Sequence, residues 1–157
     1  MTVDRFRRLN TRRRLLQAGG ALTIVPWQLA SAAFTDLPDI PALSTFLAGR
    51  WPRSERVRLV LPQLADNGQT VPMRVVVDGP FAPGPHVRAI HLFSEANPVP
   101  EMAVFEFPLA VDRVEIDSRV RLATTQRIVA VAAMSDGALY SAVAEVIVTI
   151  AGCLDGT

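Results

Sequence analysis

The sequence contains no lysine, one cysteine and two histidines among its 157 residues. The cysteine, Cys153, has no partner for an internal disulfide and stands in no Cys-x-x-Cys motif, which argues against a thiol oxidoreductase. Together with His86 and His91 it could build a usual zinc site only if several carboxylates joined it. We therefore expect neither a metal nor another cofactor.

Because lysine is absent, all sixteen basic residues are arginines, and they are unevenly distributed. Six of them precede Gly19, where Asp4 is the one acid. From Phe34 onward ten arginines stand against fourteen acids, which leaves a net charge of about −4 on the body of the chain. The body has no basic stripe with interleaved aromatic residues, so its composition argues against nucleic-acid binding.

The first 33 residues have the features of an export signal. The segment Thr11–Gln17 contains three consecutive arginines and resembles the twin-arginine signal. A weakly apolar run, Ala18–Trp27, follows, and then the small residues Ala30–Ala33, which a signal peptidase accepts. The run is shorter than the roughly twenty apolar residues of a membrane span. We expect a twin-arginine signal peptide over residues 1–33, cleavage near Ala33 and a periplasmic mature protein. The alternatives are an ordinary secretory signal and an N-terminal anchor.

Hydrophobic periodicity predicts one short helix before a series of strands. Ile40, Leu43, Phe46 and Leu47 recur at helical spacing, and this segment ends near Gly49 or Pro52. From Arg56 onward the apolar residues recur instead at every second position, which is the period of a half-buried strand. The strands that we expect are Val57–Leu61, Pro72–Asp78, Val87–Phe93, Met102–Phe107, Arg113–Leu122, Arg127–Met134 and Leu139–Ile150.

Seven short strands without a long helix predict an all-β fold, an immunoglobulin-like β-sandwich over residues 34–150 with a short N-terminal helix. The last strand is apolar on both faces: Val143 and Ile147 lie opposite a face that includes Tyr140 and Val146. It is therefore either a central strand of this domain or a strand that a second protein partly covers.

The residues after Ile150 form a short tail that carries the cysteine. Gly152 and Gly156 flank Cys153, and we expect the tail, residues 151–157, to be mobile. Seven extended residues reach at most about 25 Å. A lone cysteine is either a small buried hydrophobe or a reactive group, and its place on a tail favours the second interpretation. Asp155 disfavours the thiolate, so we expect activation inside a partner's active site.

Three stretches resemble a known family. They are Ala65–Gly68 followed by Val71-Pro72, the long segment Val87–Pro100, and Met134–Gly137. With the twin-arginine leader and the terminal cysteine, they are similar to SoxY, the sulfur-carrier subunit of the periplasmic thiosulfate-oxidising system. The resemblance covers most of residues 55–157.

The resemblance implies a fold, partners and a site. It implies an immunoglobulin-like domain that forms a heterodimer with a SoxZ-like β-sandwich subunit and catalyses nothing itself. It implies that Cys153 is the covalent attachment residue, with Gly152 and Gly156 giving the tail its flexibility. A haem-containing sulfur transferase would load the cysteine, a thiohydrolase would release sulfate, and a sulfane dehydrogenase would act in some organisms.

The tail departs from the family's usual Gly-Gly-Cys-Gly-Gly ending, because Leu154 and Asp155 follow the cysteine and Ala151 precedes Gly152. Two alternatives therefore stay open beside the standard carrier: a variant carrier for another sulfur compound, and a structural β-sandwich subunit with an incidental cysteine.

Other polar residues favour structural interpretations. His91 alternates with Phe93 along an expected strand and is interpreted as a packed structural histidine. The segment Asp66–Gly68 is interpreted as a turn, and Glu95 and Asn97 as residues that fix a loop before Pro98.

Overall fold

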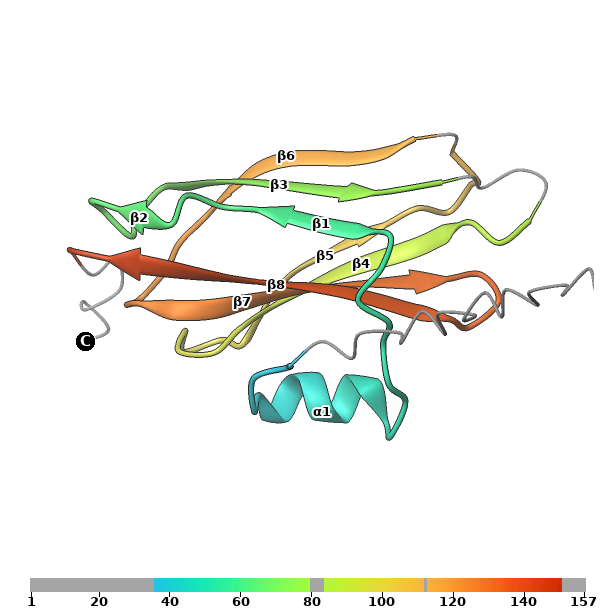
Figure 1. Cartoon of the computed structure of the whole chain (residues 1–157), viewed down its shortest axis with the longest axis horizontal. Coiled ribbons are helices and arrows are strands. Elements are labelled where there is room, and N and C mark those ends of the chain that lie inside the picture. The colour runs from blue at the N-terminus through green and yellow to red at the C-terminus, as the bar shows by residue number, and fades with distance from the viewer. Residues whose placement is uncertain (1–35, 80–83, 112, 151–157) are drawn as a thin grey trace, which may run out of the picture. The chain divides into compact units, whose positions relative to one another are not determined.

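The computed structural model describes residues 36–79, 84–111 and 113–150. The signal peptide expected over residues 1–33 and the tail expected over residues 151–157 lie outside them. The described chain forms one helix and eight strands (Figure 1). They are α1 (Pro41–Leu47), β1 (Val57–Val60), β2 (Leu64–Ala65), β3 (Val71–Val77), β4 (Val87–Ser94), β5 (Glu101–Glu106), β6 (Val114–Val120), β7 (Gln126–Met134) and β8 (Leu139–Val148).

The strands form two sheets that face each other (Figure 1). The smaller sheet has the order β1-β3-β6, and the larger has the order β2-β8-β7-β4-β5. All pairings are antiparallel except that of β2 with β8, which is parallel. The prediction of an immunoglobulin-like β-sandwich is therefore confirmed.

The space between the sheets holds the main core. Alternate residues of β3, from Val71 to Val77, are buried, and so are Ile90 and Leu92 of β4 on the opposing sheet. A strand places alternate side chains on one face, so the apolar residues that recur at every second position form the inner face of each sheet. Burying one such aliphatic side chain contributes roughly 1.5–3 kcal/mol, which makes this layer the main source of stability.

Helix α1 packs on the outer face of the five-stranded sheet. It begins at Pro41, a residue suited to the first helical position, and ends where Ala48 adopts a left-handed φ of 48°. Leu43 and Leu47 contact a second core cluster formed with Phe93, Val129, Val131 and Leu139. Strands β7 and β8 are therefore covered on one face by the smaller sheet and partly on the other by the helix.

This arrangement explains why the last strand is apolar on both faces. β8 lies inside its sheet, between β2 and β7, and Leu139 and Val143 on its outer face pack with the α1 cluster. Ile147 is farther along the same face and is 52% exposed. In Figure 1, α1 lies along the middle of β8 and does not extend to the end of the strand that leads to residue 150.

The seven strands predicted from periodicity are confirmed, with ends that differ by at most two residues. The predicted helix is also confirmed, but it ends at Leu47, before the expected end near Gly49 or Pro52. Strand β2 was not predicted. Its two residues, Leu64 and Ala65, are too few to show a period, and their pairing with Ile147 and Val148 is distant in sequence. Among the described residues, no helix is long and apolar enough to span a membrane.

The packing of α1 predicts that Leu43→Ala lowers the free energy of unfolding by about 2–5 kcal/mol, because it leaves a cavity at a side chain that is 1% exposed. Urea unfolding followed by circular dichroism measures the change. The exposed neighbour Ser44→Ala is the control and should change stability by less than about 0.5 kcal/mol. Equal stability of the two variants would mean that α1 does not belong to the cooperative unit.

Candidate functional site

The described chain ends at Ile150, three residues before Cys153, and this end is held by hydrogen bonds. The Thr149 N–H donates to the Ala65 carbonyl at 3.1 Å, and the Thr149 hydroxyl donates to the Asp66 carbonyl at 2.8 Å. The Gly68 N–H donates to the Ile150 carbonyl at 2.9 Å. We call this segment, Thr149–Ile150, the root of the tail.

Gly68 also connects the root to the other side of the sandwich. Its carbonyl accepts a hydrogen bond of 2.7 Å from the Leu122 N–H, just after β6, while its own N–H is bonded to Ile150. The turn is closed by Asn67, whose side-chain oxygen accepts from the Gln69 N–H at 2.7 Å. The interpretation of Asp66–Gly68 as a turn is confirmed, and this turn fixes the position from which the tail departs.

The loop before β7 holds the end of β8 from the other side. The Val148 N–H donates to the Thr125 hydroxyl oxygen at 2.9 Å. Thr125 lies directly before β7. A side chain as well as the backbone hydrogen bonds of the sheet therefore joins the ends of β7 and β8. The end of β8 is thus bonded to two loops from different parts of the sequence.

Asn97 organises the loops beside the root. Its side-chain amide donates to the Arg121 carbonyl at 2.8 Å, and its side-chain oxygen accepts from the Ala123 N–H and from Gln126 Nε2, both at 2.9 Å. Gln126 in turn accepts from the Ala96 N–H at 2.9 Å. The interpretation of Asn97 as a loop-fixing residue is confirmed.

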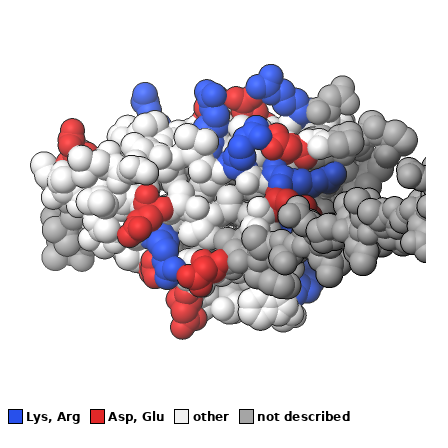
Figure 2. Space-filling view, in the orientation of Figure 1, with Lys and Arg blue, Asp and Glu red and all other residues white. Residues whose placement is uncertain are grey.

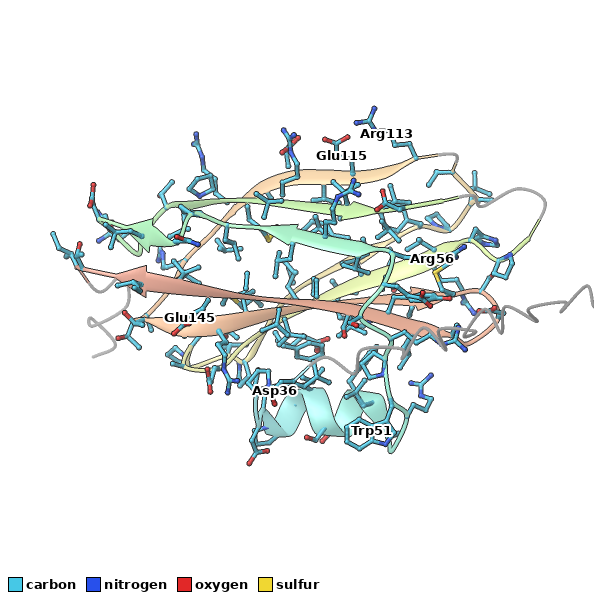
Figure 3. All side chains as sticks on the ribbon, in the orientation of Figure 1. Asp36, Trp51, Arg56, Arg113, Glu115 and Glu145 are labelled. Atoms are coloured by element: carbon cyan, nitrogen blue, oxygen red, sulfur yellow. The ribbon has the colours of Figure 1, made fainter. Side chains whose placement is uncertain are left out.

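Glu95 joins the same group through Arg127. The guanidinium donates two hydrogen bonds to the carboxylate, at 3.1 and 2.9 Å, and the Arg127 N–H donates a third at 3.2 Å. The side-chain hydrogen bond from Arg127 is the main cause that lowers the pKa of Glu95 below its ordinary value, against a smaller opposing effect of burial. Glu145 lies opposite Arg127 on β8 (Figure 3), so the group presents two acids and one base.

His91 is confirmed as a packed structural histidine. Its ring is stacked on Phe93, with 6.2 Å between centroids, and lies 4.2 Å from the ring of Phe46 in α1. Its Nδ1 is 2.8 Å from a carboxylate oxygen of Glu101. These contacts place it between the helix and the sheet. In the described ranges no three His, Cys, Asp or Glu side chains are grouped so that they could hold a metal ion.

Exposed apolar residues lie at this end of β8, and one of them, Ile150, belongs to the root itself. Leu64 and Ile147 are neighbours across the β2–β8 pair and are 56% and 52% exposed, and Ile150 is 65% exposed. We call Leu64, Ile147 and Ile150 the root patch. Figure 2 shows this end of the molecule as mainly uncharged surface beside a group of charged side chains. Sequence reasoning did not find the patch, because Leu64 is in the unpredicted β2 and the strand with Ile147 was interpreted as either a central strand or one that a second protein partly covers.

A separate cleft of about 380 Å³ opens between the edge strands β5 and β6. Its lining is largely apolar and includes Met73, Met102, Phe105 and Val120, with Arg119 and Arg121 among its residues. All of its lining residues belong to the described part of the chain, and the predicted site residues do not. Those residues, Cys153, Gly152 and Gly156, fall outside the described residues, so the structure gives the position of the root and not of the cysteine.

Comparisons with known proteins agree with the sequence resemblance. The family model "Sulfur oxidation protein SoxY" matches residues 44–153. The structure of the sulfur carrier protein SoxY from Chlorobium limicola f. thiosulfatophilum is similar at 35% identity and a TM-score of 0.52, over 62% of this chain and 82% of that one. No curated protein sequence gives a significant match.

Superoxide reductases are structurally similar at lower levels. A neelaredoxin from Ignicoccus hospitalis has 19% identity and a TM-score of 0.47, over 60% of this chain and 81% of that one. A superoxide reductase homologue from Thermotoga maritima has 20% identity and a TM-score of 0.49, over 59% and 84%. At these levels no activity of those proteins is attributed to this chain.

The Glu95–Arg127 pair predicts a pH dependence of stability. The folded pKa of Glu95 lies below its ordinary value, so the pair stabilises the fold above that value and is lost as the pH falls through the folded pKa. Glu95→Gln should therefore be less stable than wild type at neutral pH, and the difference should shrink below about pH 4. Urea unfolding at a series of pH values measures it. Glu106→Gln, at an exposed acid without an ion pair in the described ranges, is the control. A difference that stays constant with pH would contradict the assignment.

Proposed function

The chain belongs to the SoxY family of sulfur oxidation proteins, and from that premise we propose that it carries sulfur intermediates on Cys153 and presents them to partner enzymes. The observation that supports this most is the position of the root. The hydrogen-bonded root includes Ile150, and the chain's only cysteine follows three residues later. A group attached there can be offered to another protein while the domain stays folded.

The attachment chemistry is an oxidation that the carrier does not perform by itself. Joining the cysteine thiolate to the outer sulfur of thiosulfate forms an S–S bond and releases two electrons, which the haem-containing sulfur transferase would accept. Hydrolysis of the terminal sulfonate then releases sulfate and leaves a persulfide on Cys153. The tail sequence contains no histidine or lysine to activate the thiol, and Asp155 opposes ionisation, so activation belongs to the partner's site.

A carrier of this kind works through covalent tethering. An intermediate bound to Cys153 stays at high effective concentration between successive enzymes and does not diffuse away. The partner set that we propose is a SoxZ-like subunit, the haem-containing transferase, a thiohydrolase and, where present, a sulfane dehydrogenase. The periplasm is the proposed compartment, and the twin-arginine leader supports it.

Leu154 and Asp155 favour a variant carrier as the second candidate. In place of bare glycine they add one bulky apolar side chain and one charge beside the cysteine. A partner passage shaped for glycine would meet a steric and an electrostatic obstacle. A carrier whose partners accept these residues could hold a different sulfur compound by the same attachment.

We predict that Cys153→Ser abolishes thiosulfate-dependent electron transfer in a system reconstituted with the partner enzymes. The free energy of unfolding should change by less than about 0.5 kcal/mol, because the residue lies beyond the last strand. Mass spectrometry of the wild-type protein should locate added sulfur on the C-terminal peptide, and a reductant should remove the part linked through an S–S bond. Equal rates for the two proteins would refute the carrier function.

We also predict a stable heterodimer with a SoxZ-like β protein. Such an interface should bury on the order of 1,200 Å² or more in total. Sedimentation velocity of the co-expressed pair at micromolar concentration should give one complex. Two independent monomers under the same conditions would contradict this part of the proposal.

A further inference from the structure

We propose that the cleft between β5 and β6 binds a free organic anion, one with an apolar body and a single acidic head group such as a sulfonate or a carboxylate. This noncovalent site adds to the covalent one proposed at Cys153 and does not depend on it. All residues that line the cleft are described, and its shape, its lining and its charge each point to such a ligand.

The cleft exists because both sheets have an edge on the same side of the sandwich. β5 is the last strand of the larger sheet and β6 is the last strand of the smaller one, and no described strand pairs with their outer edges. Met102, Phe105 and Val120 are therefore only partly buried against the core. The opening holds about 380 Å³, which lies within the range of roughly 300–1,000 Å³ found for small-molecule sites.

Asn97 fixes the separation of the two walls. It lies in the loop before β5, and its side chain donates to the Arg121 carbonyl at 2.8 Å and accepts from the Ala123 N–H at 2.9 Å, just beyond β6. The same amide donates to the Met102 sulfur at 3.3 Å. Because these bonds join the edges of the two sheets, the cleft is formed before a ligand enters, and a preformed site lowers the cost of binding. A cleft bridged in this way also suits a compact ligand better than a continuous peptide strand.

The charged residues of the cleft are all basic. Arg119 and Arg121 line it, both are exposed, and the lining contains no acid. Neither guanidinium forms an ion pair with a described acid. By contrast, Arg58, Arg74 and Arg113 of the smaller sheet and its border each have an acidic partner. Two positive charges that no described acid neutralises, beside an apolar surface, are complementary to an anion with an apolar body.

The apolar walls determine how selective the site is. The body of the ligand lies against Met73, Met102 and Phe105, and the head group is bound at Arg119 and Arg121. Because methionine side chains are flexible and polarizable, such walls adapt to chains or rings of several shapes. The acidic head group is therefore the feature that all ligands of this site share.

The test compares two probes that differ only in charge. Octane-1-sulfonate, below its micelle concentration, and octan-1-ol are titrated calorimetrically into the exported chain, with its partner subunit where the two copurify. Two temperatures are used, because burial of an apolar body gives a negative heat-capacity change, and heat that is absent at one temperature appears at the other. The sulfonate should bind about fivefold more tightly than the alcohol.

Removing either charge should affect the sulfonate alone. Arg119→Gln and Arg121→Gln should each weaken sulfonate binding about threefold, as expected for exposed charges, and leave octanol binding unchanged. Arg88→Gln is the matched control, because Arg88 is exposed on β4, has no ion pair with a described acid and does not line the cleft. Its affinity for both probes should equal that of wild type.

Filling the cleft should affect both probes. Ala103 lines the cleft opposite Leu92, so Ala103→Phe places a ring in the space and should abolish binding of the sulfonate and of the alcohol. Thermal unfolding followed by circular dichroism checks that this variant is folded. Cys153→Ser should bind the sulfonate as wild type does, because the site does not use the cysteine.

Four results would overturn the proposal. They are no sulfonate binding by wild type, equal sulfonate binding by wild type and the two arginine variants, loss of binding when the partner subunit is added, and flotation with phosphatidylglycerol vesicles that Arg119→Gln abolishes. The third would make the cleft a subunit interface, and the fourth would make it a site for a membrane lipid. Failure of the carrier function is distinguishable from all four, since it appears as turnover by Cys153→Ser.

Discussion

The backbone of Gly68 makes the two hydrogen bonds on which the geometry of the functional end depends. Its carbonyl is bonded to Leu122, which follows β6 of the smaller sheet, and its N–H to Ile150, which follows β8 of the larger sheet. One buried residue therefore connects the two layers at the point where the chain leaves the sandwich. Without the bond from Gly68 to Ile150, Thr149 would be the last described residue that the Ala65–Gly68 segment holds.

Side-chain amides make the neighbouring loops equally firm. The Asn97 side-chain amide donates and accepts hydrogen bonds that hold residues 121–126. The Gln126 side-chain oxygen accepts a hydrogen bond from the Ala96 N–H. Buried polar groups are stable only when each finds a partner, and among the described residues no buried side-chain nitrogen or oxygen is left unpaired. The end of the domain that bears the tail is thus fixed by three connected loops rather than by core packing alone.

The sequence was sufficient for the strands and insufficient for the connections between them. Strands such as β6 were predictable because Val114 and Ile116 alternate with Glu115 and Asp117, a pattern that one buried face imposes. The role of Gly68 was not predictable, since backbone hydrogen bonds leave no side-chain signature and its partners are distant in sequence. For the same reason the sequence could not decide what covers β8, because the answer depends on where α1 packs.

The candidate site likewise has one part that the sequence predicts and another part that only the structure shows. Cys153 is proposed from its uniqueness, its position and the family resemblance, none of which needs coordinates, whereas the root patch exists only because β2 places Leu64 beside Ile147. A longer tether would give the cysteine more reach but would lower its effective concentration at any one active site and remove the need for a matching surface. Because only Ala151 and Gly152 lie between Ile150 and Cys153, an enzyme that bound this cysteine would also be brought close to the folded domain. Specificity among partners can then reside in the folded surface as well as in the residues next to the cysteine. In that case Leu154 and Asp155 would add to a partner specificity that the folded surface already provides.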